Sequence, residues 1–285
     1  MALAEFKPKL LIYESLLFLV IQALAILAGH RVVALGEASI PPPEGGIFRL
    51  GQILLAFGIA IVIMIIVLKF LKTKFTFNIF FALLIFVGSQ AIFGAFLPFI
   101  PSIALAVALI AIRWKFPNLI THNLAIIFGV AGVAMILGIS LRPWPEIILL
   151  LIALSIYDFV AVFKTKFMIN LFKQLLRRGA PLAIMVPEKP TAMKEHVAKV
   201  SVKKLKEKDK KVLMLGSGDL AFPTIFAVSA FVTIGLIPTL AIIAGSLAGL
   251  TANHYLLTIK KFKFIPALPL IAIFSILAFL ISLIF

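Results

Sequence analysis

Long apolar segments alternate with short polar connections along most of the chain. A helix needs about 20 apolar residues to cross the hydrocarbon of a bilayer, and most of these segments approach that length. The pattern therefore predicts nine membrane-spanning helices. We place them at residues 10–30, 50–70, 76–97, 99–113, 119–139, 145–163, 212–234, 237–257 and 264–285. The first is too long for the core of a signal peptide and lacks a small-residue cleavage site, so we expect a true span.

One polar connection is much longer than the others. Residues 164–211 separate the sixth and seventh spans and divide the chain into three parts: spans one to six (1–163), a basic loop (164–211), and spans seven to nine (212–285). Within the loop, residues 167–185 mix apolar and basic side chains. This mixture predicts a helix that lies on the membrane surface.

The composition supports an all-α polytopic membrane protein. Hydrophobic residues make up 63% of the chain and the mean hydropathy is +1.19, whereas soluble domains have about 45–50% apolar residues. The chain has no cysteine, and we find neither a glycine-rich phosphate loop nor an HExxH zinc helix. We therefore expect no cofactor and no metal.

The basic charge follows the expected topology. With the amino terminus placed inside, 24 of the 27 Lys and Arg residues fall on the inner side, and the outer side has only Arg31, Arg49 and Arg142. Cytoplasmic loops carry such an excess of basic residues. We therefore expect a multi-pass protein of the cell membrane with its amino terminus and the 164–211 loop in the cytoplasm and its carboxyl terminus outside. The net charge of +16 then needs no nucleic-acid partner.

Two of the three aspartates lie inside apolar spans. Asp209 belongs to the basic loop, whereas Asp158 and Asp219 belong to spans six and seven. An Asp near the centre of a spanning helix costs about 2.5–3.5 kcal/mol on insertion scales, so such residues usually face a polar cavity and have a function.

These two aspartates have similar expected depths. Asp158 is six residues before Lys164, and Asp219 is eight residues after Lys211. At 1.5 Å per helical residue, the depths are about 9 Å and about 12 Å from one surface. If the two spans are neighbours, both carboxyls can share one water-filled site. We expect no Ser-His-Asp arrangement at this depth, because all four histidines fall in loops or near span ends: His30, His122, His196 and His254.

Two close carboxyls tend to hold one proton between them. The ionised member can take a proton from water while the protonated member polarises a carbonyl. This is sufficient for amide hydrolysis without a metal or a covalent nucleophile. A proton- or cation-coupled transporter could use the same pair as a relay, although such transporters often contain internal repeats, and no clear repeat is visible. A purely structural buried pair is a further alternative.

Helix-breaking residues flank the second aspartate and begin the last span. Gly216 and Gly218 enclose Ser217 just before Asp219, which weakens a helix and lets another backbone approach. Pro266-Ala267-Leu268-Pro269 opens span nine from the same side. Irregular backbone at membrane depth is tolerated around a protein cavity. In contrast, Gly245 and Gly249 form a small-xxx-small face that predicts helix packing.

Three of these sequences resemble family signatures. Tyr157-Asp158, Gly216-Ser217-Gly218-Asp219 and Pro266-Ala267-Leu268 are similar to the YD, GxGD and PAL motifs of the presenilin and signal peptide peptidase family, in the same order on spans six, seven and nine. The resemblance covers essentially the whole chain. It implies a presenilin-like fold of nine helices and the hydrolysis of peptide bonds within transmembrane segments or remnant signal peptides.

The resemblance also implies roles for individual residues. Asp158 and Asp219 would form the catalytic pair, with the other motif residues shaping the site: Tyr157, Gly216, Ser217, Gly218, Pro266, Ala267 and Leu268. Residues Leu213 to Leu215 would pair as a strand with an unwound substrate. The implied partners are transmembrane-helix substrates and lipid, and homo-oligomerisation stays open. Pro269 looks presenilin-like and Pro223 peptidase-like, so the branch of the family stays open too.

Overall fold

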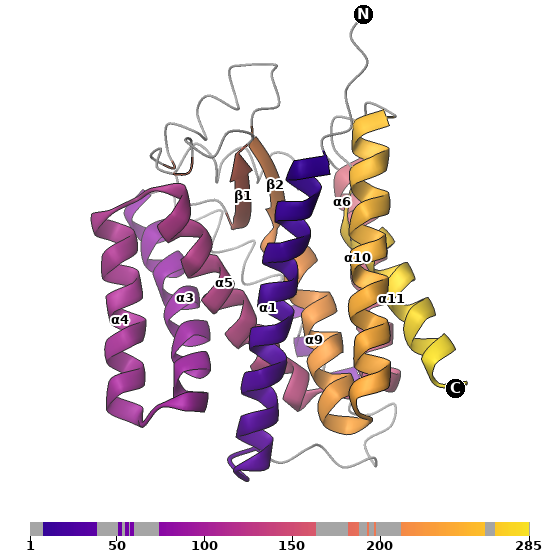
Figure 1. The fold of residues 1–285 in the computed structure, drawn as a ribbon, viewed down its shortest axis with the longest axis horizontal. Helices are drawn as coiled ribbons and strands as arrows, with labels where there is room; N and C mark the ends of the chain where they lie inside the picture. Colours follow the sequence, from indigo (N-terminus) through magenta and orange to yellow (C-terminus); the bar gives the residue numbers. More distant parts are fainter. Residues whose placement is uncertain are drawn as a thin grey trace, which may run out of the picture.

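The computed structural model shows an upright bundle of helices with a small sheet at one end (Figure 1). It describes residues 8–38, 51–52, 55–56, 58–59, 74–163, 182–187, 193, 197, 212–259 and 266–284. The helices are α1 (Pro8–Ala34), α3 (Lys74–Phe96), α4 (Phe99–Lys115), α5 (Leu119–Ser140), α6 (Ile148–Phe163), α9 (Ser217–Thr233), α10 (Leu236–Ile259) and α11 (Leu268–Ser282). A π-helical turn, η1 (Pro143–Ile147), precedes α6, and the two strands are β1 (Ala183–Pro187) and β2 (Val212–Gly216).

The protein is a mostly helical, multi-pass membrane protein. The described residues contain eight helices. Five segments are long and apolar enough to cross a membrane: Pro8–Ala34, Asn78–Phe96, Leu119–Ser140, Pro143–Val160 and Leu236–Leu257. The shorter helices α9 and α11 are also apolar. Most of the expected second span, residues 50–70, lies outside the described residues, and so the count of nine stays a prediction.

The expectation of an all-α chain was wrong at two segments. The apolar pattern places residues 212–216 at the start of span seven, although the resemblance implies that Leu213 to Leu215 pair as a strand with a substrate. The pattern also predicts that residues 183–185 end a surface helix that begins at 167. Instead, Ala183–Pro187 and Val212–Gly216 form an antiparallel pair in which Ala183 lies opposite Gly216. Pro187 cannot donate to a helix and Gly216 weakens one, whereas the strands satisfy each other's backbone groups. The other residues of the expected surface helix lie outside the described part of the chain, apart from Leu182.

The centre of the bundle is α5, which contacts α1, α3 and α9. Small residues allow this close approach, as in other membrane helix pairs. A Cβ atom added at Gly132 would lie 1.7 Å from the carbonyl oxygen of Gly88, and one added at Gly88 would lie 2.0 Å from that of Gly129. The backbones of α3 and α5 therefore touch directly.

Helices α10 and α11 pack in the same way. A Cβ atom at Gly249 would lie 2.6 Å from the Cα atom of Ile271, and one at Gly245 would lie 2.5 Å from the carbonyl oxygen of Phe274. This confirms the predicted packing role of the two glycines. Helix α11 begins at Leu268, shortly before Ile271.

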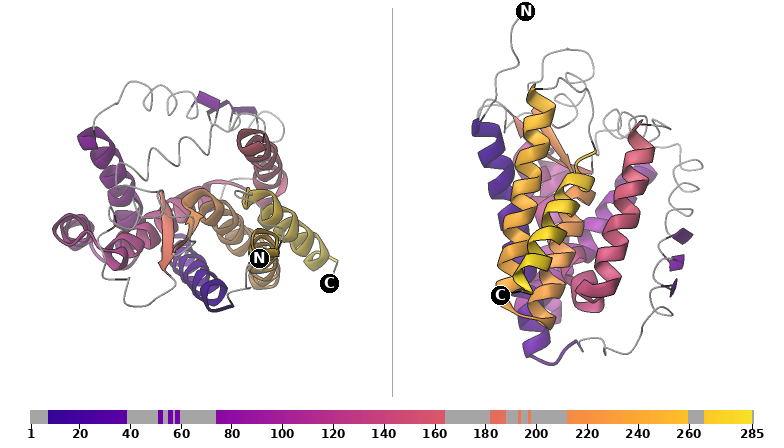
Figure 2. Two further views of the ribbon diagram at one scale, coloured as in Figure 1. Left: turned by 90° about the horizontal axis from the view of Figure 1, so that it is seen from above. Right: turned by 90° about the vertical axis from the view of Figure 1, so that its right-hand side faces the viewer.

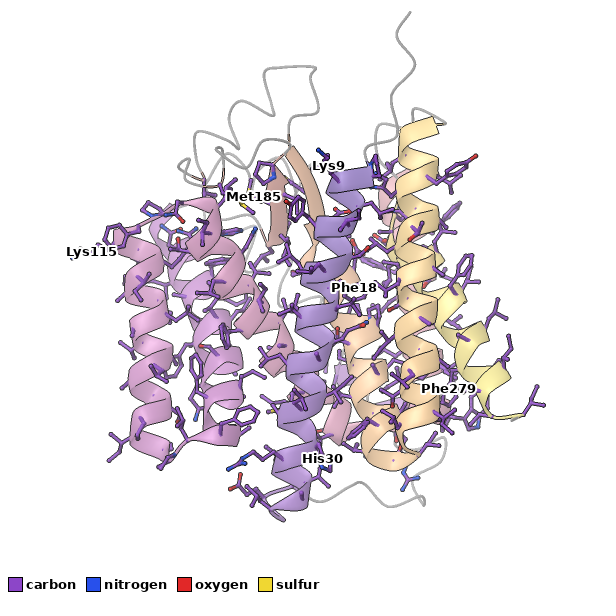
Figure 3. The ribbon with its side chains drawn as sticks, viewed as in Figure 1. Lys9, Phe18, His30, Lys115, Met185 and Phe279 are labelled. Atoms are coloured by element: carbon purple, nitrogen blue, oxygen red, sulfur yellow. The ribbon has the colours of Figure 1, made fainter. Side chains whose placement is uncertain are left out.

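The sheet lies at the end of the bundle where α1 begins and α4 ends. Figure 3 shows Lys9, Lys115 and Met185 at this end, and His30 near the other. Seen from above in Figure 2, the strands lie between α5 on one side and α9 on the other, in agreement with the contacts of α5 with β1 and of α9 with β2. The sheet therefore stands next to the start of α9.

Candidate active site

Asp158 lies in the last third of α6. Its side chain is 7% exposed, although its neighbours Tyr157 and Phe159 are 37% and 55% exposed. Helix α6 contacts α11, and thus Asp158 is on the face of α6 that turns toward the bundle. The exposed Tyr157 is on an adjoining face.

Asp219 is the third residue of α9, immediately after β2. Its carboxylate accepts hydrogen bonds from the backbone N–H groups of Gly216 and Leu268. One carboxylate oxygen, Oδ2, would lie 3.0 Å from a Cβ atom added at Gly216. The end of β2, the start of α9 and the start of α11 therefore meet at this carboxylate, at helix N-termini that favour negative charge.

The two carboxyl groups lie close enough for Asp158 to act electrostatically on Asp219. They come from different helices, and α11 contacts both α6 and α9. The fold therefore brings together the two aspartates that the sequence placed at similar depth.

The Pro-Ala-Leu segment is buried at the start of α11. Pro266, Ala267 and Leu268 are all buried, and the carbonyl oxygen of Ala267 accepts a hydrogen bond of 3.2 Å from the N–H of Ile271. The C=O of Ala267 and the N–H of Leu268 belong to one peptide group and point in opposite directions. Because the C=O points along the helix, the N–H points away from it and donates to the carboxylate of Asp219.

The residues around the two glycines have different surroundings. The N–H of Ser217 donates to the carbonyl oxygen of Leu182 at 3.0 Å, which extends the strand pair by one hydrogen bond. Gly218 is exposed, and a Cβ atom there would come no nearer than 3.7 Å to Phe222. Leu215 is buried and its side chain borders the cavity next to Asp219.

That cavity has a volume of about 80 Å³ and polar as well as apolar walls. It can hold water, which needs only about 10–15 Å³ of such space and two or more polar partners. The lining residues are Glu14, Met214, Leu215, Asp219, Leu250, Asn253, His254, Leu257 and Ala267. Within the described residues, no group of three or more His, Asp or Glu side chains could hold a metal ion.

A buried histidine and a buried glutamate lie together on the wall of this cavity. Nδ1 of His254 is 3.7 Å from Oε2 of Glu14, both side chains are about 5% exposed, and Glu14 acts electrostatically on Asp219. Sequence reasoning missed this pair. His254 is near the end of α10, as expected, but that end borders the cavity of Asp219. A signal was present, because His254 is six residues before Lys260, the same interval that separates Asp158 from Lys164.

Comparisons with known proteins found one matching family and similar solved structures. The model of the family described as "Signal-peptide peptidase, presenilin aspartyl protease" matches residues 15–285. Two solved structures of a presenilin family intramembrane aspartate protease, in C222 and P2 crystal forms, are similar to the chain. The first has 25% identity, covers 96% of this chain and 98% of its own, and superposes with a TM-score of 0.67. The second has 26% identity, coverages of 95% and 96%, and a TM-score of 0.65. A search of the curated proteins gave no match.

Proposed function

This chain belongs to the signal-peptide peptidase and presenilin family of intramembrane aspartyl proteases, and we propose that Asp158 and Asp219 are its catalytic pair. The observation that carries the proposal is the convergence at Asp219. Its carboxylate interacts with Asp158 and accepts backbone hydrogen bonds from both the GxGD and the Pro-Ala-Leu segments. A transporter relay needs two carboxyls but gives no reason for a strand that ends beside one of them.

The chemistry uses a water molecule between the two carboxyl groups, which share one proton. The ionised carboxylate takes a proton from the water as its oxygen attacks the carbonyl carbon of the substrate, and the protonated carboxyl donates a hydrogen bond to the carbonyl oxygen. The resulting tetrahedral intermediate collapses as the C–N bond breaks, and the leaving nitrogen receives the proton that the carboxylate took from the water. The products are a new carboxyl end and a new amino end.

The substrate is a transmembrane segment that is locally unwound and extended. In an antiparallel pair, residues direct their N–H and C=O groups alternately toward and away from the partner strand. Met185 directs both groups to a side chain of α5, and so Met214, opposite it, directs its own away from β1. Two residues on, the N–H of Gly216 reaches Asp219. A substrate strand that pairs with Met214 would therefore bring a peptide bond to Asp219.

This register narrows the expectation that Leu213 to Leu215 bind the substrate. Leu213 and Leu215 direct their backbone groups toward β1, so Met214 is the residue between them that can exchange hydrogen bonds with a third strand. The side chain of Leu215 contacts the site through the cavity instead.

The site opens toward the cytoplasm in this proposal. Lys9 and Lys115 lie at the same end of the bundle as β1 (Figure 3), and basic residues collect on the cytoplasmic side. The amino terminus and the loop 164–211 would then be cytoplasmic. This loop would connect a membrane part of residues 1–163 to a second membrane part of residues 212–285.

A peptide isostere that carries a hydroxyl in place of the scissile carbonyl tests the pair by binding alone. Such an isostere mimics the tetrahedral intermediate and hydrogen-bonds to both carboxyls. We expect its affinity to fall at least tenfold in Asp158→Asn and in Asp219→Asn, each separately. Asp209→Asn, which changes the remaining aspartate of the chain, is the matched control and should bind as the wild type does. Unchanged affinity in either of the first two variants would rule out the assignment.

A further inference from the structure

We propose that Asn123, assisted by His122, is a positioning residue of the protease: it closes the outer edge of β1 and thereby holds β2 in place beside Asp219. The inference rests on the proposed function, because it concerns the strand pair along which a substrate would extend. Asn123 is in the first turns of α5 and its side chain is 5% exposed. It does not line the cavity next to Asp219.

The side chain of Asn123 takes the place of a neighbouring strand. Its Nδ2 donates to the carbonyl oxygen of Met185 at 2.8 Å, and the N–H of Met185 donates to its Oδ1 at 3.0 Å. An amide carries both a donor and an acceptor, so it can satisfy both backbone groups of one residue. This reciprocal pair is the one that an adjacent β-strand would form.

The same edge is closed on both sides of Met185. Nε2 of His122 is 3.1 Å from the carbonyl oxygen of Ala183, to which it can donate. On the edge of β1 that faces α5, the N–H and C=O groups of Met185 are therefore both hydrogen-bonded, and the C=O group of Ala183 has a donor. Pro187, two residues beyond Met185, has no N–H group to be paired. The sheet can grow on the β2 edge, where Asp219 is.

His122 packs against Phe81 of α3, and Phe81 in turn contacts Arg113 of α4. The ring of His122 stacks on Phe81, with the ring centroids 5.8 Å apart and the planes within 3°. The Cζ atom of Arg113, on α4, is 5.7 Å from the centroid of the Phe81 ring. All three side chains are buried. The imidazole therefore has little freedom to leave the carbonyl of Ala183.

A second set of contacts fixes β1 to the segment before α5. The side chains of Leu119, Met185 and Val197 form a buried cluster, and the N–H of Val197 donates to the carbonyl oxygen of Pro117 at 3.0 Å. Helix α5 thus positions β1, and β1 positions β2 through the strand pair. Gly216, at the end of β2, then hydrogen-bonds to the carboxylate of Asp219.

The substitution Asn123→Asp tests this role because its effect depends on pH. A protonated aspartic acid offers one O–H donor and one C=O acceptor, as the amide does, whereas the ionised form has only acceptors to place against the carbonyl oxygen of Met185. We expect kcat/KM of the variant, on a single-span reporter in detergent, to be at least tenfold below the wild type at neutral pH. The ratio of the two should rise toward one as the pH falls. Taking the ratio removes the pH dependence that both enzymes share.

Asn123→Leu keeps a similar volume and removes both hydrogen bonds at every pH. We expect a loss of kcat/KM of at least tenfold and a wider spread of cut positions, measured by mass spectrometry of the products. Thr121→Val is the matched control. Among the described residues, its hydroxyl, two residues away on α5, bonds to the carbonyl oxygens of Phe116 and Asn118 and to no other group. The variant should cut at the wild-type positions with a similar kcat/KM.

The melting temperature of each variant, measured at each pH, separates positioning from folding. A variant-to-wild-type ratio for Asn123→Asp that stays flat with pH overturns the proposal, whether or not Asn123→Leu folds. A ratio that changes only because folded enzyme is lost also overturns it. Failure of the catalytic assignment looks different, because then Asp158→Asn or Asp219→Asn still cleaves, whatever the ratio for Asn123→Asp does.

Discussion

Glycines bring groups into close contact in two regions of the molecule, but their neighbours differ. Between α3 and α5, the atoms that a Cβ at Gly132 would meet belong to the backbone of another helix. At the end of β2, the first atom that a Cβ at Gly216 would meet is a carboxylate oxygen of Asp219. The first contact holds two helices together, and the second leaves room for a reacting group. The same substitution should therefore change stability in one region and activity in the other.

The largest effect is expected for Gly132→Ala. The new methyl group would lie 1.7 Å from the carbonyl oxygen of Gly88, so α3 and α5 must move apart. Overpacking of this kind costs about 1–3 kcal/mol or more. We expect a marked fall in the yield of folded protein and in its melting temperature in detergent. Gly129→Ala, on the same helix, is the control, because its methyl group would lie 3.4 Å from the nearest atom, the Cα atom of Ile85. Equal stability of the two variants would contradict the description of this contact.

Gly216→Ala should instead reduce activity in protein that stays folded. Its methyl group would lie 3.0 Å from Oδ2 of Asp219, and a displaced catalytic group can cost about a hundredfold in rate. We expect kcat/KM on a single-span reporter to fall by about tenfold to a hundredfold, with a melting temperature close to that of the wild type. Gly51→Ala, where no atom of the described residues lies within 4 Å of the added methyl group, should keep both. Full activity of Gly216→Ala would show that the carboxylate has more room than this contact allows.

The depth of a residue could be predicted from the sequence, but its direction around the helix could not. Counting from the basic residues placed Asp158 and Asp219 at similar depth, and their interaction agrees with that. The same count would have placed Glu14 and His254 near them. We did not expect a contact, because depth does not say which face of α1 or α10 turns toward α9.

The pairing of the two strands could not be predicted for a different reason, although the resemblance implied that Leu213 to Leu215 form a strand with a substrate. Val212 to Gly216 is a short apolar run, and periodicity cannot distinguish such a run from the first turn of a helix. Its partner, Ala183 to Pro187, is separated from it by a long basic segment, so no turn signal links the two. The amide of Asn123 completes the pairing from a third part of the chain. Sequence alone thus indicated the two acids and the breakers around them, but not the sheet that positions one of them.

The dependence of rate on pH tests whether the two carboxyl groups of the site act as a pair. Two interacting carboxyls titrate as a pair and are active with one proton between them. The rate should therefore fall on the acid side, where both are protonated, and on the alkaline side, where both are ionised. We expect a bell-shaped plot of kcat/KM against pH for the wild type. A profile with only one limb across the range in which the protein stays folded would mean that the carboxyls do not act as a unit.

The smallest effect is expected at a polar contact of the scaffold. Nε2 of Gln22 on α1 donates to the hydroxyl of Ser246 on α10 at 3.0 Å. Such hydrogen bonds between membrane helices contribute about 0.6 kcal/mol on average. Ser246→Ala should lower the melting temperature by about 1–2 °C and leave kcat/KM unchanged. The control is Thr251→Val, because that exposed hydroxyl bonds to the carbonyl oxygen of Leu247 within α10 and, in the part of the chain that the structure describes, to no other helix. A large loss of activity in Ser246→Ala would contradict the expectation that contacts of the scaffold affect stability and not activity.

The most direct test of the account is cleavage by the two aspartate variants. The wild type, Asp158→Asn, Asp219→Asn and Asp209→Asn are each incubated with a single-span reporter in defined detergent, after their melting temperatures show that they are folded. The account predicts that the wild type and Asp209→Asn cleave at similar rates, and that Asp158→Asn and Asp219→Asn, each alone, do not cleave detectably. Cleavage at the wild-type rate by either of those two would contradict it.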